Sequence, residues 1–466
     1  MPDNLSQFSG ADVRAEARRI LALAWPIVLT GLNWTLMQVI DVAVVGQYGT
    51  DELAALGASR TLTWIAVVLG ISSLTGVLVY TAQADGGKRL AETGDNLRAG
   101  LLLGVALGTG IAAILGLGAY PLLRLIGVEP ALLAPSAPVV EAMALAFPAQ
   151  LAFFAASYFL EGISRPRRVM IVNLGMLGVN AVLAWAWVGG HLGFPALGAV
   201  GAAYATAVAS WLGAGAMILF AWTVSDAAER GVRDLSAGAL KRAALGVPRL
   251  LWFGTVPAIA ASLELAGFAW LIVLSTRLGN DVAASFQAML ALHNLLFAIA
   301  YGFASAAGVR VGNAVGAGER DQAWPRALIA AGLSVAVIGV LSLFLVLFSK
   351  TAMLPFSDDP AVLAAGAAML AIMASFLIFD GLQYLFGAGL RSLNEQVWAG
   401  VNGIIGFFVV TGGLGWVLVS SGWGANGLAW AAAMGMLVTA VLQFGRFYYV
   451  LKLRPEPLRS AARSSG

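Results

Sequence analysis

Long apolar segments alternate with short polar ones along the whole chain. About 20 consecutive apolar residues suffice to cross a bilayer as a helix, and twelve segments reach that length. Their predicted limits are 18–46, 53–82, 97–120, 136–160, 168–190, 197–224, 247–276, 281–308, 323–349, 361–388, 397–420 and 425–451. The pattern predicts an all-α, polytopic membrane protein with twelve transmembrane helices.

The two halves of the chain resemble each other. YGTDELAA at 48–55 resembles LGNDVAA at 278–284, and GFPALGAVG at 193–201 resembles GWGANGLAW at 422–430. The offset is close to 230 residues, which is about half of the chain. Six spans is an even number, so both halves insert in the same orientation. Parallel repeats of this kind are related by an axis along the membrane normal and place the substrate site between the halves.

The repeat and the charges give a domain plan. We expect an N-lobe at 1–224 with spans 1–6, a cytoplasmic linker at 225–246, and a C-lobe with spans 7–12 and a cytoplasmic tail at 247–466. Lys and Arg gather in the even-numbered turns and at both ends of the chain. The odd-numbered turns hold only Arg124, Arg277 and Lys350. By the positive-inside rule, both termini are cytoplasmic.

Composition agrees with this class and excludes several others. The 466 residues are 60% hydrophobic and 11% charged, against about 25% charged in a soluble protein. Cysteine is absent, which excludes disulfides and thiolate metal sites. There is no zinc-protease, phosphate-loop or nucleophile-elbow motif, so we expect no enzyme and no nucleotide-driven pump. The Gly-rich run 312–318 is typical of a helix C-cap and tight turn. A net charge of +3 from loop residues does not indicate nucleic-acid binding.

Three acidic residues lie inside predicted spans. Glu264 is near the middle of the apolar stretch 247–276, Asp41 is toward the outer end of the first span, and Asp380 is in the tenth. A carboxyl in lipid is costly, so each must face protein or water and is a candidate proton or cation site. The repeat does not conserve the acids, since the equivalent positions in the other half carry Leu271, Trp34 and Phe153.

Each of these groups also has a structural interpretation. Asp41 could be a helix-end aspartate that reaches water, and Glu264 could be held protonated by neighbours such as Ser262. Asp380 could make a helix–helix hydrogen bond. A lone histidine such as His293 is more often a packing residue than a proton relay.

Further polar residues inside the spans are candidates to line a cavity or support the acids. Asn33 shares a helix face with Asp41 at i, i+8, and Gln383 is one turn from Asp380. The set comprises Asn33, Gln38, Asn180, Gln287, His293 and Gln383. Some of the tryptophans could line a cavity for aromatic cations.

Several stretches together resemble the multidrug and toxic compound extrusion family, called MATE. They are WPIVLTGLNWTLMQVIDVAVVGQYG near the start, FLEGISRPR at 159–167, GVRVGNAVGAG at 308–318 and FDGLQYLFGAGLR at 379–391. With GFPALGAVGAAYAT they spread over nearly the whole chain. The resemblance implies twelve helices in two six-helix lobes that form a V. It also implies antiport of drugs against sodium or protons.

The resemblance also assigns roles to residues. In the NorM-type branch, a Glu of the seventh helix and an Asp of the tenth serve cation coupling, and they match Glu264 and Asp380, which are therefore possible Na⁺ ligands. The first-helix Asp of the family matches Asp41. Asn180 matches an Asn of the DinF-type branch, but the Asp that follows it four residues later is Ala184 here. This departure argues against a sodium site in the N-lobe and favours C-lobe coupling or protons.

These observations lead to one expected function and two alternatives. We expect a monomeric multidrug exporter in the cell inner membrane of a GC-rich bacterium. It would export cationic or aromatic drugs in exchange for H⁺ or Na⁺, with membrane lipid and the drugs as its partners and no cofactor. A lipid-linked precursor flippase of a related superfamily would instead need cationic residues in its cavity for a pyrophosphate group. An intramembrane enzyme would have only the carboxyls and one histidine to use.

Overall fold

The computed structural model describes residues 9–454, which are helical and contain no strand. Most helices are long enough to cross a bilayer. In chain order they are α1 Gly10–Tyr48, α2 Thr50–Ser73, α3 Thr75–Gly86, α4 Leu90–Leu125, α5 Pro130–Ala144, α6 Phe147–Gly162, α7 Pro166–Gly189, η1 His191–Gly193, α8 Gly198–Trp222, α9 Ala237–Arg277, α10 Asn280–Gly316, α11 Arg320–Leu347, α12 Ser349–Met353, α13 Pro360–Ser392, α14 Gln396–Gly403, η2 Ile404–Thr411, α15 Gly412–Ser420, α16 Gly424–Tyr448 and η3 Tyr449–Leu453.

The helices make twelve spans, as the apolar pattern predicts. Eleven are helical segments, with α2 and α3 forming one and α14, η2 and α15 forming another. The twelfth is the pair α5 and α6, which bends by 44° at a short break. The span predicted over 136–160 is therefore present, but it is built from two helices instead of one. Pro148 explains the break, because it cannot donate a backbone hydrogen bond to Ala144 and its ring crowds that carbonyl.

Several helices extend well beyond the apolar segments. Ser9 caps α1 in a capping box with Asp12, and Ser236 caps α9 by accepting a hydrogen bond from the Ala239 N–H. As a result α9 begins ten residues before the predicted seventh span, within the expected linker 225–246. Just before this cap, hydrogen bonds from Ser236 hold the pKa of Asp234 below its usual range.

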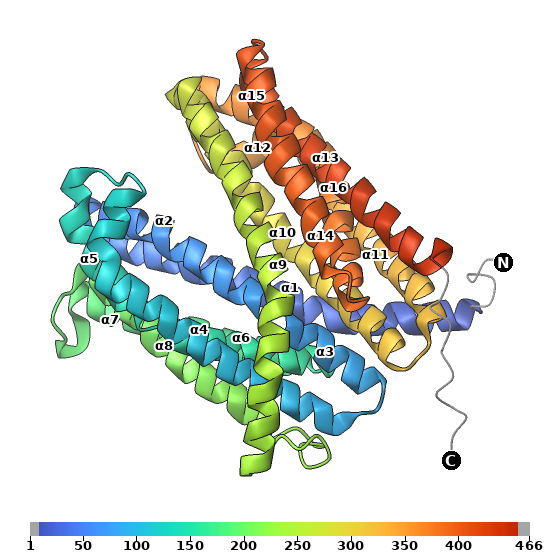
Figure 1. Cartoon of the computed structure of the whole chain (residues 1–466). Coiled ribbons are helices and arrows are strands. Elements are labelled where there is room, and N and C mark those ends of the chain that lie inside the picture. The colour runs from blue at the N-terminus through green and yellow to red at the C-terminus, as the bar shows by residue number, and fades with distance from the viewer. Residues whose placement is uncertain (1–8, 455–466) are drawn as a thin grey trace, which may run out of the picture.

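The twelve spans form two lobes arranged as a V whose arms diverge toward the upper left of Figure 1. Each lobe has its own apolar core, around Phe153 and Phe159 in the N-lobe and around Phe286 and Met373 in the C-lobe. The first turns of α1 belong to the opposite lobe, since Ile20 packs in a C-lobe core with residues of α10, α11 and α13. The predicted two-lobe, V-shaped fold is confirmed.

The lobes meet through close backbone contacts at the vertex. A methyl group at Gly316 would overlap the Gln83 carbonyl, and one at Gly254 would overlap that of Ser73. Across the same junction, Asn313 Nδ2 donates to the Ala82 carbonyl at 2.8 Å. Small residues allow such close helix packing. This end of the V is therefore tightly closed.

The internal repeat is visible in the backbone. Lys88 and Gly318, and likewise Ser164 and Asn394, have positive φ and lie 230 residues apart. Each of these four residues follows the end of a helix. The next residue donates its N–H to a carbonyl five residues back, as Glu319 does to Ala314, and this bond closes the turn. The glycine-rich run 312–318 is thus a helix end and turn, as predicted.

Candidate functional site

The C-lobe candidate site contains Asp380 on α13, whose side chain is buried. His293 on α10 lies with its Nε2 at 3.1 Å from Asp380 Oδ2. Gln383, one turn along α13, donates from Nε2 to Asp380 Oδ1 at 3.2 Å. Both carboxylate oxygens are therefore engaged, and the contact with His293 joins two helices.

Glu264 on α9 is half-buried and faces α13. The hydroxyl of Tyr384 donates to Glu264 Oε1 at 2.8 Å. The expected support from Ser262 is wrong, because its hydroxyl donates to the carbonyl of Ala258 one turn earlier. Tyr384 follows Asp380 by one turn of α13, so this hydrogen bond holds Glu264 beside the turn that carries Asp380. The structure thus brings the two predicted acids into one site.

Aromatic rings surround these acids. Phe268 stacks with His293 at a ring distance of 6.1 Å, and Phe297 meets Tyr384 edge-on at 4.7 Å. Gly267, beside Phe268, lets α9 approach the π-helical turn η2, because a methyl group there would overlap the Phe407 carbonyl. Aromatic faces attract organic cations. The chemistry of the site is therefore acidic and aromatic together.

No arginine or lysine forms an ion pair with Glu264 or Asp380 anywhere in residues 9–454. Arg391, two turns from Tyr384 on α13, lies within electrostatic reach of Glu264 without forming such a contact. The same stretch holds no group of three or more His, Cys, Asp or Glu side chains able to hold a metal ion. A sodium ion at this site would therefore need hydroxyl, carbonyl or water oxygens besides the two carboxylates.

The N-lobe candidate site contains Asp41, which is only 5% exposed and so is not a helix-end aspartate in water. Arg60 of α2 pairs with it, from Nη2 to Asp41 Oδ2 at 3.2 Å. Asn180 of α7 donates to Oδ1 at 3.4 Å, and Thr206 of α8 lies at 3.5 Å from Oδ2. Four helices thus converge on this carboxylate.

Of the remaining predicted polar residues, Asn33 and Gln38 lie near the N-lobe site and Gln287 lies at neither site. Asn33 is buried on α1 about two turns before Asp41, and its Nδ2 donates to the Asn173 carbonyl at 3.0 Å. Gln38 contributes its backbone carbonyl to Arg60. Gln287 is exposed on α10 and makes no side-chain hydrogen bond to either site within the described chain.

Three features of these sites are not predicted from the sequence: Arg60, Tyr384 and the inter-lobe contact of Glu161. Arg60 could have been found, because it is a charged residue inside the predicted span 53–82. Glu161, at the end of α6, is buried and accepts a hydrogen bond at 3.0 Å from Ser305 of α10. Its role and that of Tyr384 depend on helix pairing that spacing along the chain does not reveal.

The chain resembles known proteins over most of its length. The MatE family model matches the chain twice, over residues 26–186 and 257–417. The two matches begin at equivalent positions of the internal repeat and cover most of both lobes. The probable multidrug resistance protein NorM of Caulobacter vibrioides is 32% identical, with 91% of this chain and 89% of that protein covered. The multidrug resistance protein PmpM of Pseudomonas aeruginosa is 29% identical, with 93% and 91% covered.

Solved structures share the fold. The eukaryotic MATE transporter AtDTX14 superposes with a TM-score of 0.82 at 20% identity, with 93% of this chain and 96% of that chain covered. A MOP superfamily transporter from Pyrococcus furiosus, described as having a binding pocket of reverse polarity, gives a TM-score of 0.82 at 19% identity, with 94% and 96% covered. At these identities the similarity establishes the architecture alone.

Proposed function

The chain belongs to the MatE family as a NorM-type member, and on that premise we propose that it is a multidrug exporter working by secondary antiport. It would export organic cationic or aromatic compounds in exchange for H⁺ or Na⁺. The relatives named as multidrug resistance proteins support export of drugs. The choice of cationic cargo and of the coupling ion comes from the chemistry of the sites.

One observation carries the proposal: Glu264 and Asp380 lie in one membrane-embedded site without an ion pair to Lys or Arg. Two neighbouring carboxylates repel each other and attract a cation. A proton, a sodium ion or an organic cation would each relieve this repulsion. We therefore assign cation coupling to these two acids.

Competition for these carboxyls would drive exchange. An antiporter needs ion and cargo to favour opposite conformations, because a ligand with equal affinity for both shifts neither. Protonation or sodium binding would neutralise Glu264 and Asp380 and release a cationic cargo. His293, in contact with Asp380, is placed to take part in proton movement, although its contact also stabilises the packing of α10 against α13.

The aromatic rings around the acids favour a cargo that is flat and apolar as well as charged. Phe268, Phe297 and Tyr384 offer ring faces and edges next to the carboxyls. Cation–π contacts of this kind contribute about 0.5–2 kcal/mol. A pyrophosphate-bearing lipid would instead meet two negative charges, so the acidic site disfavours the flippase alternative.

We assign Asp41 to conformational switching of the N-lobe rather than to sodium binding. Its carboxylate is already paired with Arg60 and joins α1 to α2, α7 and α8. A buried carboxylate that ties four helices together is placed to couple their movement. Ala184 removes the further acid that a sodium site at this position would use.

The expected membrane setting is the bacterial inner membrane with both termini in the cytoplasm. The vertex contains the helix ends that the positive-inside rule assigns to the cytoplasm, including those of α3 and α10. The V would then open outward in this conformation. We propose that the monomer works without a cofactor, with membrane lipid around it and the drug and coupling ion as its ligands.

The experiment is a drug-susceptibility panel in an efflux-deficient bacterium, combined with ethidium efflux from energised vesicles. Expression should raise resistance to cationic aromatic drugs, and efflux should respond to replacement of sodium or collapse of the proton gradient. If resistance and efflux match the empty-vector control under every ion condition, the chain is not such an exporter.

A further inference from the structure

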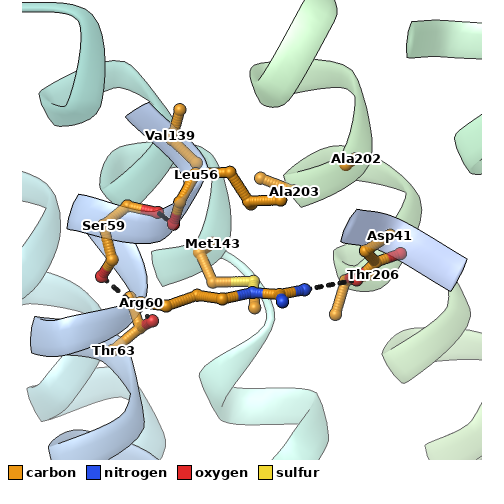
Figure 2. Close-up of a pocket in the computed structure, with 10 residues that line it drawn as sticks. All are labelled: Asp41, Leu56, Ser59, Arg60, Thr63, Val139, Met143, Ala202, Ala203 and Thr206. Carbon is orange, nitrogen blue, oxygen red and sulfur yellow. Dashed lines mark hydrogen bonds and ion pairs between the residues drawn. The ribbon is translucent and has the colours of Figure 1, made fainter. Parts of the chain in front are cut away.

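Arg60 is a charged side chain inside a membrane span, and it reaches across from α2 to α1. Figure 2 shows its guanidinium lying along the pocket toward Asp41. Besides the contact with Asp41 at 3.2 Å, its Nη1 donates to the Gln38 carbonyl at 3.4 Å. Both ends of the guanidinium are thus held by α1, in a fork that suits a carboxylate and a carbonyl one turn apart.

The space beside this pair is small and otherwise uncharged. The cavity measures about 10 Å³, which is room for about one water molecule. Apart from Asp41 and Arg60, all the residues that line it are neutral. The other hydrogen-bond donors to Asp41, Asn180 and Thr206, carry no charge either. The Arg60 guanidinium is therefore the counter-ion of the Asp41 carboxylate.

We propose that Arg60 is the resident cation of the N-lobe site, a specificity-determining residue that neutralises Asp41 and keeps free cations away from it. A carboxylate buried among neutral groups needs a proton, a bound cation or an ion pair. The tethered guanidinium meets this need at high effective concentration, without drawing an ion from solution. With room for about one water molecule left, a hydrated sodium ion does not fit beside the pair.

This inference deepens the proposed function and rests on it in one respect: it confines the exchange of ion and cargo charge to Glu264 and Asp380. The N-lobe site would keep its charge balance throughout the transport cycle, whereas the C-lobe site would change its occupant. Arg60 would thus act by fixing the state of Asp41 rather than by touching the cargo.

The test is labelling of purified protein with dicyclohexylcarbodiimide, which forms a stable adduct with protonated carboxyls in apolar surroundings. Peptide mass spectrometry reports adducts at Asp41 and Glu264 separately, and no cargo is needed. In Arg60→Gln, labelling of Asp41 should rise about tenfold, because removing one partner of a buried pair leaves the other charge uncompensated and favours its protonation. Sodium should suppress that new labelling. Arg60→Lys, which keeps the charge, should stay close to wild type.

Labelling of Asp41 in Arg60→Gln at or below the wild-type level overturns the proposal. If Arg60→Gln does not fold, labelling of the wild type is the test. In the wild type, Asp41 should be labelled less than Glu264, and sodium should not change the labelling of Asp41. Equal, sodium-sensitive labelling of both acids in wild type would also overturn it. Because the assay uses no drug, loss of drug export with the expected labelling would refute the proposed function alone.

Discussion

The N-lobe and C-lobe place buried carboxyls on the same helical scaffold but balance their charge differently. Asp41 has an arginine from the next helix as its partner. Glu264 and Asp380 instead have a tyrosine, a glutamine and a histidine, with no arginine or lysine ion pair in the described chain. A neutralised site can hold helices together, whereas two unneutralised acids need a proton or cation. Under the proposed function, the N-lobe site would therefore serve structure and switching, and the C-lobe site would exchange ions.

Neutralising the C-lobe acids should have the largest effect. Glu264→Gln or Asp380→Asn should reduce ion-driven ethidium efflux about 100-fold or to background, because each removes a carboxyl that we propose binds the coupling ion. Efflux from vesicles, normalised to the amount of protein in the membrane, measures the loss. Glu129→Gln, at an exposed position before α5, is the matched control and should transport normally. Wild-type rates in either C-lobe mutant would remove those acids from the mechanism.

Breaking the N-lobe pair should have the next largest effect. Asp41→Asn leaves Arg60 unpaired at a site where the arginine side chain is 23% exposed. Removing one partner of a fully buried pair costs about 3–5 kcal/mol, and this exposure reduces the expected cost to about 1–3 kcal/mol. Transport should fall roughly tenfold at every sodium concentration.

The double mutant Asp41→Asn with Arg60→Gln is the control for that prediction. It removes both charges and should recover a large part of the stability, measured by thermal unfolding in detergent. If Asp41→Asn alone transports at the wild-type rate and leaves drug resistance unchanged, Asp41 is only structural.

A smaller effect should follow from Tyr384→Phe, which deletes the hydroxyl that donates to Glu264. A hydrogen bond contributes about 1 kcal/mol, so the apparent affinity for the coupling ion should change about fivefold. The sodium or proton concentration at half-maximal efflux measures the change. An unchanged ion dependence would mean that Tyr384 does not position Glu264. Tyr80→Phe, whose ring packs near Phe253 away from the acids, is the matched control.

The smallest effect on transport is expected at Gly267, which lets α9 pack against η2. Gly267→Ala would place a methyl group against the Phe407 carbonyl and cost about 1–3 kcal/mol through overpacking. The melting temperature should fall by several degrees. Gly403→Ala, where no atom lies within 4 Å of the added methyl group, should leave it unchanged. Equal melting temperatures would show that α9 can shift without cost.

Much of the fold follows from the apolar pattern, because the bilayer forces the backbone into helices of a set length. The broken fourth span also had a signal in Pro148, which the hydropathy pattern obscured. The early start of α9 depends on a cap at Ser236, outside the apolar segment. The hydropathy pattern predicts which part of a helix crosses the lipid, whereas the capping residue predicts where the helix begins.

The sites were only partly predictable. Glu264, Asp380 and Asp41 stood out because charged residues inside spans are costly. The same argument applies to Arg60, but its partner depends on how α1 and α2 pack. The hydrogen bond from Tyr384 to Glu264 joins two residues that are 120 apart in sequence and lie on different helices, so local spacing cannot predict it.

Under the proposed function, drug and coupling ion compete through the charge of the C-lobe carboxyls. The most direct measurement is equilibrium binding of ethidium to purified protein across pH and sodium concentration. Affinity should fall as the pH drops or as sodium rises, because either ion neutralises the carboxylates that attract the cation. Glu264→Gln should flatten that dependence, whereas Arg60→Lys should preserve it. Ethidium affinity in the wild type that is independent of both ions would contradict the account.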